Sequence, residues 1–525
     1  MRILIFHGYL LRGTGSNVYN ASLARTLSAL GHQVHLLCQD RRACELDWVN
    51  RVGEWEGGEL RVRDVRPGAG RGSVSVYTPD IGGLLPVYVA DTYEGFEVKT
   101  FPELSEAELD RYLAANVAAV RDVDAAAGGA EAALANHLVM GPVILARAGL
   151  RFALKVHGSD LSYTVLPHPR FVPYAEEGVA AASAALVGSG YTAEDLWRAL
   201  PDPGVRERTR LGPPGVDVRA FRRRDPGQAT AALRELAEVL REIPADLEGG
   251  AFGRDPAEGA RALEWFAAAE GPRVLFVGKL IANKGVDLLV AAWPLVAREH
   301  PGARLLLVGF GALREGLEQL LGSLGAGDLE TARRLAARGR ALEGGEPGGL
   351  PILSGFLADP PPGYAEAAAA AAGSIEISGR LEHSEVAELM PAVEALAMPS
   401  TFPEAFGMVA VEAAACGALP ISADHSGMRE VSQRLGESVA PEIARLLSFE
   451  VGPGAIDQIA ERLLAWLALS DAERQAIGAQ LATRAAELWS WEKVAEGVIA
   501  ASQGQLDRLP KVTDSQGEGA GRPSE

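Results

Sequence analysis

The length and the charge of the 525-residue chain exclude several classes of protein. The chain is too long for a single hydrophobic core and fits two domains of ordinary size. A formal net charge of −19 argues against nucleic acid or an anionic bilayer as the main partner, and the longest apolar runs have the length of strands, so we expect no membrane span.

The cysteines and the N-terminus together favour a cytoplasmic enzyme. Cys38, Cys44 and Cys416 have neither a metal-ligand spacing nor the even number of a disulfide framework. The first residues, 1–6, read as a short strand that enters a glycine-rich loop, which is not the pattern of a signal peptide. We therefore expect a reducing compartment.

The N-terminal residues predict the start of a parallel α/β sheet. A strand over residues 3–6 precedes a loop that contains Gly13 and Gly15, then a helix with one apolar stripe, then a second strand over residues 34–38. Glycine lets a backbone approach a phosphate closely, and the following helix start offers free N–H groups. We expect Gly13 and Gly15 to contribute to a ligand site, although a plain strand-to-helix turn is the alternative.

Two later strands of this half end in polar residues. The strand over residues 152–156 is followed by His157, and the strand over 184–187 is followed by a Gly-Ser pair. Ligands of doubly wound sheets bind at the carboxyl ends of the strands. A histidine at a strand end is often only a capping or core residue, but here His157 is also a candidate for the site.

A Pro/Gly-rich break over residues 211–217 predicts the boundary between two domains. We expect a first domain over 1–215, a second over 216–484, a helix over about 485–508 that crosses back to the first, and a disordered tail over 509–525. Two atypical stretches interrupt the second domain. The stretch over about 222–270 is interpreted as an insertion, and that over about 323–371 as an excursion on the surface.

The second domain begins with a strand over residues 274–277 that leads to Gly278, Lys279 and Lys284 and then to a helix. Two lysines at the ligand edge of a sheet can stabilise the charge of a departing diphosphate. The alternative is that both are solvated surface lysines.

Residues 400–417 are the most informative segment of the chain. After a buried strand end, Glu404 lies in a predicted loop and Glu412 in a short helix that stops at a glycine. The backbone N–H groups of about residues 406–409, namely Phe406, Gly407, Met408 and Val409, would point out of the helix N-terminus, where an anion is favoured. Carboxylates accept hydrogen bonds from sugar hydroxyls. Two carboxylates beside a diphosphate cradle predict a nucleotide-sugar site.

The spacing of Glu404 and Glu412, together with residues 403–409, resembles the Glu-x7-Glu signature of the family-4 retaining glycosyltransferases. The resemblance implies a GT-B fold of two facing Rossmann-like domains, with the donor on the second domain and the acceptor on the first. It implies that Glu404 holds hydroxyls of the transferred sugar, that Glu412 holds the ribose, and that His157 meets the reacting sugar. Because an imidazole beside a transient glycosyl cation is best kept neutral, we expect His157 to position the reacting groups.

The chain departs from the family at two positions. Lys279 stands where arginine is usual and Asn283 where glutamate is usual, so the geometry at the diphosphate is in doubt, because lysine cannot span two phosphate oxygens as arginine does. Asp91 and Lys99 are further candidates for an acceptor pocket. The basic run Arg219–Arg224 is a possible but not favoured membrane contact.

The resemblance implies transfer of a hexose from a nucleotide diphosphate sugar to an acceptor hydroxyl with retention of configuration. We expect no metal and no other cofactor, because the one Asp-x-Asp pair, Asp122 and Asp124, lies in the first domain. A sugar-nucleotide epimerase of the same fold and a catalytically silent sugar-binding protein remain alternatives. A glycogen or starch synthase is disfavoured, because the Lys-Thr-Gly-Gly-Leu loop expected near its N-terminus is absent.

Overall fold

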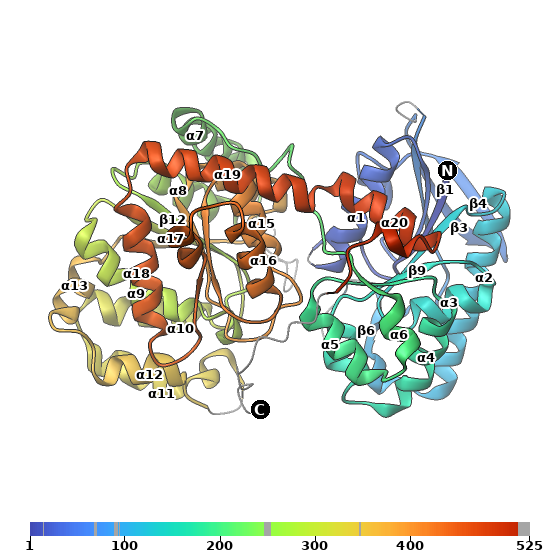
Figure 1. The fold of residues 1–525 in the computed structure, drawn as a ribbon, viewed down its shortest axis with the longest axis horizontal. Helices are drawn as coiled ribbons and strands as arrows, with labels where there is room; N and C mark the ends of the chain where they lie inside the picture. The colour runs from blue at the N-terminus through green and yellow to red at the C-terminus, as the bar shows by residue number, and fades with distance from the viewer. Residues whose placement is uncertain are drawn as a thin grey trace. The chain divides into compact units, whose positions relative to one another are not determined.

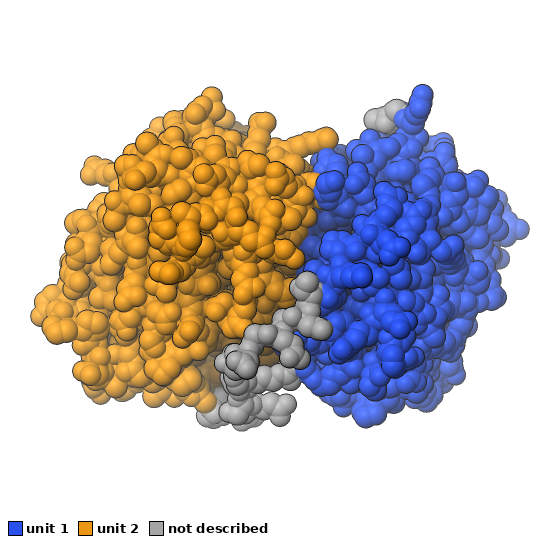
Figure 2. Space-filling model, in the orientation of Figure 1, with its two compact units in different colours: residues 1–215, 491–525 blue, residues 216–490 orange. Residues whose placement is uncertain are grey.

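The computed structural model describes residues 1–13, 15–67, 71–88, 93, 95–245, 254–345 and 348–512. The chain forms two compact units, unit 1 from residues 1–215 and 491–525 and unit 2 from residues 216–490 (Figure 2). Each unit is built on a parallel sheet with helices on both faces (Figure 1). The fold is therefore α/β with two Rossmann-like units, as the sequence predicts.

Unit 1 contains a nine-stranded sheet in the order β11-β10-β9-β8-β1-β2-β5-β3-β4, parallel except for the β3–β4 hairpin. A separate parallel pair is formed by β6 and β7. The strands and helices of unit 1 are β1 (Arg2–Phe6), α1 (Ser16–Ala29), β2 (Gln33–Leu37), β3 (Arg51–Glu56), β4 (Glu59–Asp64), β5 (Ser73–Thr78), β6 (Leu84–Val87), β7 (Glu97–Thr100), α2 (Glu106–Ala127), β8 (Ala132–Asn136), α3 (Gly141–Ala148), β9 (Ala153–Lys155), α4 (Val172–Ala181), β10 (Ala185–Val187), α5 (Gly190–Ala199), α6 (Pro203–Arg208), β11 (Thr209–Leu211) and α20 (Trp491–Ser502).

The two faces of this sheet are buried in two separate apolar clusters. Ile3 and Ile5 of β1 pack with residues of α1 and α20, whereas Leu4 and Phe6 pack with residues of α2 and α3. Side chains of a strand alternate between the two faces of the sheet, so a central strand that is covered on both faces must be apolar at every position.

Unit 2 contains a six-stranded parallel sheet in the order β14-β13-β12-β15-β16-β17. Its strands and helices are α7 (Pro226–Glu242), α8 (Pro256–Ala267), β12 (Arg273–Val277), α9 (Val286–Glu299), β13 (Arg304–Val308), α10 (Arg314–Gly325), α11 (Leu329–Arg338), α12 (Pro351–Ala358), α13 (Tyr364–Ala370), β14 (Ile375–Gly379), α14 (His383–Leu389), β15 (Ala395–Met398), α15 (Met408–Ala415), β16 (Leu419–Ala423), α16 (Ser426–Gly436), α17 (Pro441–Ala444), β17 (Ser448–Phe449), α18 (Ala455–Leu467) and α19 (Asp471–Trp489).

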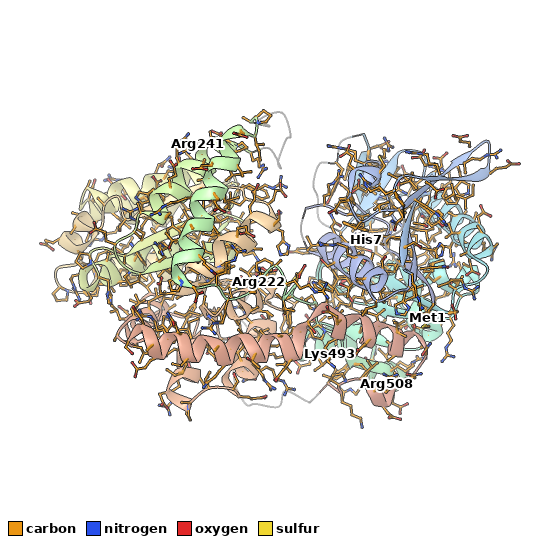
Figure 3. The ribbon with its side chains drawn as sticks, turned by 90° about the horizontal axis from the view of Figure 1, so that it is seen from above. Met1, His7, Arg222, Arg241, Lys493 and Arg508 are labelled. Atoms are coloured by element: carbon orange, nitrogen blue, oxygen red, sulfur yellow. The ribbon has the colours of Figure 1, made fainter. Side chains whose placement is uncertain are left out.

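The first atypical stretch, over about 222–270, forms α7 and α8, which pack on each other while α8 lies against β14 and β13. Leu233, Leu240 and Leu263 are fully buried there. Arg241 in the last turn of α7, labelled in Figure 3, forms an ion pair with Glu264 of α8. These helices cover part of the sheet of unit 2.

The second atypical stretch, over about 323–371, is not the surface excursion that the sequence suggests. Leu357 and Tyr364 belong to the core of unit 2, and the Tyr364 hydroxyl donates to the carbonyl of Ala291 in α9 at 2.7 Å. The helices α12 and α13 pack against α9. The Pro- and Gly-rich composition of the stretch marks the turns between these short helices.

The C-terminal segment differs from its prediction in two respects. The expected crossing helix over about 485–508 is two helices, because α19 ends at Trp489 in unit 2 and α20 begins at Trp491 in unit 1. The predicted disordered tail is wrong for residues 509–512, since Leu509 is buried and the Pro510 carbonyl accepts from the Leu211 N–H at 2.9 Å. The rest of that tail lies outside the described residues.

Candidate functional site

In unit 2, the loop after β12 carries the two predicted lysines. The loop starts at Gly278, whose N–H donates to the Val308 carbonyl at 3.0 Å, and Lys279 follows as an exposed side chain. A single 3₁₀ turn, η6 (Ala282–Lys284), then leads into α9. Gly285 ends the turn at φ 63°, and a Cβ there would lie 1.9 Å from the Pro399 carbonyl oxygen, so only glycine lets the two loops approach this closely.

The loop after β15 carries Glu404, which forms an ion pair with the Lys284 ammonium. The same carboxylate accepts from the Ser400 hydroxyl at 3.0 Å, and the Glu404 N–H donates to the Ser426 hydroxyl at 2.9 Å. Both partners of the pair are largely shielded, with 31% of the lysine side chain and 25% of the glutamate side chain exposed. Because β12 and β15 are neighbouring parallel strands, their carboxyl-end loops meet at one edge of the sheet.

The residues between the two glutamates have different environments. Phe406 is buried, and its ring meets Trp489 edge-on at 5.8 Å. Only its backbone is therefore a candidate for ligand contact. Gly407 is the N-cap of α15, and Met408 and Val409 are its first two helical residues, partly buried against the core. The first N–H that bonds within the helix is that of Ala410, which donates to the Gly407 carbonyl at 3.1 Å.

Glu412 lies in α15 with 4% of its surface exposed, and its carboxylate bonds the His383 Nε2 at 2.7 Å. Burial alone would lower the pKa of His383, but the nearby carboxylates, chiefly Glu412 and then Asp217, raise it above its ordinary value. The Phe221 ring lies 4.9 Å from the imidazole. Glu412 thus has an imidazole partner at the start of α14, at the carboxyl end of β14.

In unit 1, His157 belongs to a chain of hydrogen bonds at the carboxyl ends of β1, β8 and β9. Its Nε2 bonds the Asn136 amide oxygen at 2.8 Å, and the Asn136 amide donates to Asn20 Oδ1 at 2.7 Å. The Asn20 amide in turn bonds the Nδ1 of His7 at 3.0 Å. Figure 3 labels His7, which follows β1.

The imidazoles of this cluster are neutral at physiological pH. Burial lowers the pKa of His7 to about 4, and burial followed by the neighbouring His137 and Lys155 lowers the pKa of His157 well below its ordinary value. The His137 ring lies 4.6 Å from the His157 ring and is buried. A neutral imidazole offers one donor and one acceptor, which suits hydroxyl groups.

The remaining predicted residues that the structure describes, Gly13, Gly15 and Lys99, all lie in unit 1. Gly13 and Gly15 lie in unit 1 at φ 103° and φ 55°, and Gly15 is the N-cap of α1, whereas the other predicted donor-binding residues lie in unit 2. Lys99 donates to Glu108 at 2.6 Å and lies 3.3 Å from Glu97, so its charge is compensated. Asp91 lies outside the described residues.

Two arginines of the basic run Arg219–Arg224 have partners within unit 2, whereas Arg222 is exposed. Arg224 forms a two-bonded ion pair with Glu388, and Arg223 donates to the Gln475 carbonyl at 3.1 Å. No helix among the described residues has the length and apolar character needed to cross a bilayer.

The two aspartates of the Asp-x-Asp pair have separate roles in unit 1. Asp122 accepts from the Trp55 indole at 2.9 Å, and Asp124 accepts from the Ala130 N–H at 2.7 Å. Across the described ranges of the chain, no three His, Cys, Asp or Glu side chains gather as a metal site would require.

Sequence reasoning missed several polar residues of the site. Ser400, His383 and Ser426 lie two to four residues after the ends of β15, β14 and β16, at the edge where ligands bind, so their place in the chain was a usable signal. His425 is a fourth, and its Nε2 bonds the Ser400 carbonyl at 2.9 Å.

Two family models, both described as glycosyl transferases group 1, match this chain at residues 271–335 and 365–480. Both matches fall inside unit 2, and they include the loops that carry Lys284 and Glu404 and the helix that carries Glu412. Residues 336–364, between the matches, are covered by neither.

Among curated proteins, the chain is 28% identical over 296 residues to D-inositol 3-phosphate glycosyltransferase of Segniliparus rotundus, covering 56% of this chain and 46% of that protein. The chain spans about half the length of the curated relatives it matches.

Among solved structures, the sucrose-phosphate synthase of Thermosynechococcus elongatus is similar with a TM-score of 0.54 and 18% identity, covering 97% of this chain and 98% of that one. Anabaena HepE, solved in complex with UDP and glucose, is similar with a TM-score of 0.53 and 15% identity, covering 97% and 100%. These likenesses confirm the GT-B fold.

The pair of His383 and Glu412 predicts a pH dependence. Because the folded-state pKa of His383 is raised, the imidazole contributes stability below its unfolded pKa of about 6.5 and loses that contribution as the pH rises through the folded pKa. An NMR titration of the His383 ring should give a pKa above the ordinary value in the wild type and a lower one in Glu412→Gln. Glu366→Gln, on the exposed face of α13, is the control. Equal His383 pKa values in the wild type and Glu412→Gln would contradict the assignment.

Proposed function

Because unit 2 carries the domain of the glycosyl transferases group 1, we propose that the protein is a retaining glycosyltransferase. It moves a hexose from a nucleotide diphosphate sugar to a hydroxyl of an acceptor. The observation that carries the proposal is the pairing of Lys284 with Glu404, which places a phosphate-binding cation against a hydroxyl-binding carboxylate. A nucleotide sugar presents these two chemical groups side by side.

The donor binds to the loops of unit 2. Lys279, Lys284 and the N–H groups at the start of α15 hold the diphosphate, to which Gly278 and Gly407 allow close approach. Glu404 accepts from the hexose hydroxyls, and Glu412 accepts from those of the ribose. The phosphate competes with Glu404 for the Lys284 ammonium, which releases this carboxylate to the sugar.

The reaction exchanges one bond at the anomeric carbon for another on the same face. The bond from that carbon to the β-phosphate oxygen breaks, and a bond to the acceptor oxygen forms. The acceptor's proton passes to the departing phosphate oxygen. Lys284 stabilises the charge that develops on the leaving diphosphate, in a site where both side chains are largely shielded from water.

The acceptor belongs to unit 1 in this proposal. His157 is neutral and fixed by Asn136, so it orients hydroxyls by hydrogen bonds and does not add a positive charge beside an electron-poor anomeric carbon. No divalent metal takes part in the proposed reaction, because the lysines and the helix start neutralise the diphosphate.

The two glutamates should differ in their kinetic effect. Glu404→Ala should lower kcat by about 10²–10³-fold, as for loss of one group that acts at the reacting centre. Glu412→Ala should mainly raise the donor KM, because ribose contacts change little on the way to the transition state. Steady-state kinetics with the donor varied would separate the two effects, with the exposed Glu437→Ala as the control. Equal losses of kcat at unchanged KM would contradict the division of roles.

Metal independence and retention can be measured together. Turnover should survive EDTA, and proton NMR of the fresh product should show the anomeric configuration of the donor. An inverted product would rule out the same-face reaction, and a strict requirement for Mg²⁺ would rule out charge neutralisation by the lysines. Release of an altered sugar without any acceptor would instead indicate an epimerase.

A further inference from the structure

A short turn outside the two group 1 matches contacts the loop that carries Lys284. The turn is η7 (Arg340–Glu343), between α11 and α12, within residues 336–364. It belongs to the stretch whose role the sequence leaves unread, and the proposed reaction does not use it.

Two side chains of this turn hold the first two residues of η6. The Glu343 carboxylate accepts from the Ala282 N–H at 2.8 Å, and the Arg340 guanidinium donates to the Asn283 amide oxygen. Arg340 Nε lies 3.5 Å from Glu343, so the two side chains also hold each other. Glu343 is mostly shielded, with 13% of its side chain exposed.

The backbone of η6 connects the turn η7 to the ion pair of Lys284 and Glu404. The Asn283 carbonyl accepts from the Thr401 N–H at 2.9 Å and from the Ser400 hydroxyl at 3.0 Å. The single Ser400 hydroxyl proton is shared with Glu404 Oε1, which also lies 3.0 Å from Ser400 Oγ, and the residue after Asn283 is Lys284. Asn283 therefore connects η7, by its side chain, to both partners of the ion pair.

The turn is itself firmly anchored. The Arg340 N–H donates to the Gly348 carbonyl at 2.8 Å, and a Cβ at Gly339 would lie 1.7 Å from that oxygen, so the approach requires glycine. Leu342 packs against the core of unit 2. A fixed turn can transmit its position to η6, which a solvated loop could not.

We propose that the turn Arg340–Glu343 is a clamp on the loop after β12, which carries Lys279 and Lys284. Arg340 and Glu343 are positioning residues that fix Lys284 for the donor diphosphate. The proposal rests on the proposed function. The chain has Asn283 where the resembled motif has a glutamate, and an amide binds the guanidinium without neutralising it. The charge of the guanidinium is balanced by Glu343, 3.5 Å from Arg340 Nε, so the clamp acts by fixing the position of the loop.

The test is calorimetric titration of the full chain with UDP, GDP and ADP. Arg340→Ala should weaken binding of the nucleoside diphosphate that the wild type prefers by about tenfold, because the loop must then be ordered on binding. Arg340→Lys, which keeps a donor for Asn283, should recover most of the affinity. Asn283→Ala removes the same contact from the other side and should match Arg340→Ala. Arg338→Ala, at the exposed end of α11, is the control and should leave binding unchanged.

A double-mutant comparison separates a loss of Lys284 positioning from a general destabilisation of the fold. In a Lys284→Ala background, Arg340→Ala should have no further effect, since the clamp acts through that lysine. Unchanged affinity in both Arg340→Ala and Asn283→Ala, or full additivity with Lys284→Ala, would overturn the clamp alone. A wild type that binds none of the three nucleotides would overturn the proposed function together with the clamp.

Discussion

The ion pair between Lys284 and Glu404 is the interaction on which the organisation of unit 2 at its ligand edge depends. It joins the loops after β12 and β15, which are neighbours in the sheet. Two opposite charges that are largely shielded from water are stable only when each has a partner. Removing either one leaves the other unpaired, so the pair constrains both loops at once. A phosphate can replace Glu404 as the counter-ion of Lys284, and sugar hydroxyls can then donate hydrogen bonds to the Glu404 carboxylate.

The two units present different chemistry at the carboxyl ends of their strands. Unit 2 has charged groups there, with Lys284, Glu404 and the pair of Glu412 and His383. Unit 1 has a cluster in which His157 and Asn136 are joined directly, beside the buried side chains of Lys155 and Asp160. Imidazoles and amides can each donate and accept hydrogen bonds, which suits the acceptor hydroxyl that we assign to this unit.

The sequence predicts the fold well where the pattern is local. The strands before Gly278 and before Glu404 are short apolar runs bounded by glycine or proline, and they form β12 and β15 as expected. The burial of the stretch over about 323–371 could not be predicted in this way. Its helices are short and each contributes few core residues, such as Tyr364, so only their packing on α9 distinguishes them from a surface excursion.

Only part of the site can be predicted from the sequence, because residues that are distant in the chain meet there. Glu404 and Lys284 are identified from residues near them in the chain, but their direct pairing, across 120 positions, depends on the order of strands in the sheet. His383 gave no signal of its own as the partner of Glu412, since a single histidine at a helix start has many possible roles. Arg340 lies outside any recognisable motif, and only its contact with Asn283 connects it to the site.

The central claim is that the ligand edge of unit 2 binds a nucleotide diphosphate sugar through Lys284. The most direct measurement is the thermal unfolding of the full chain with UDP-glucose, GDP-mannose and ADP-glucose, each compared with its nucleoside monophosphate, since a ligand that binds only the folded state raises Tm. We predict that at least one nucleotide sugar raises Tm, that its monophosphate does so far less, and that Lys284→Ala loses the shift. Absence of any shift in the wild type, or an equal shift in Lys284→Ala, would contradict the account.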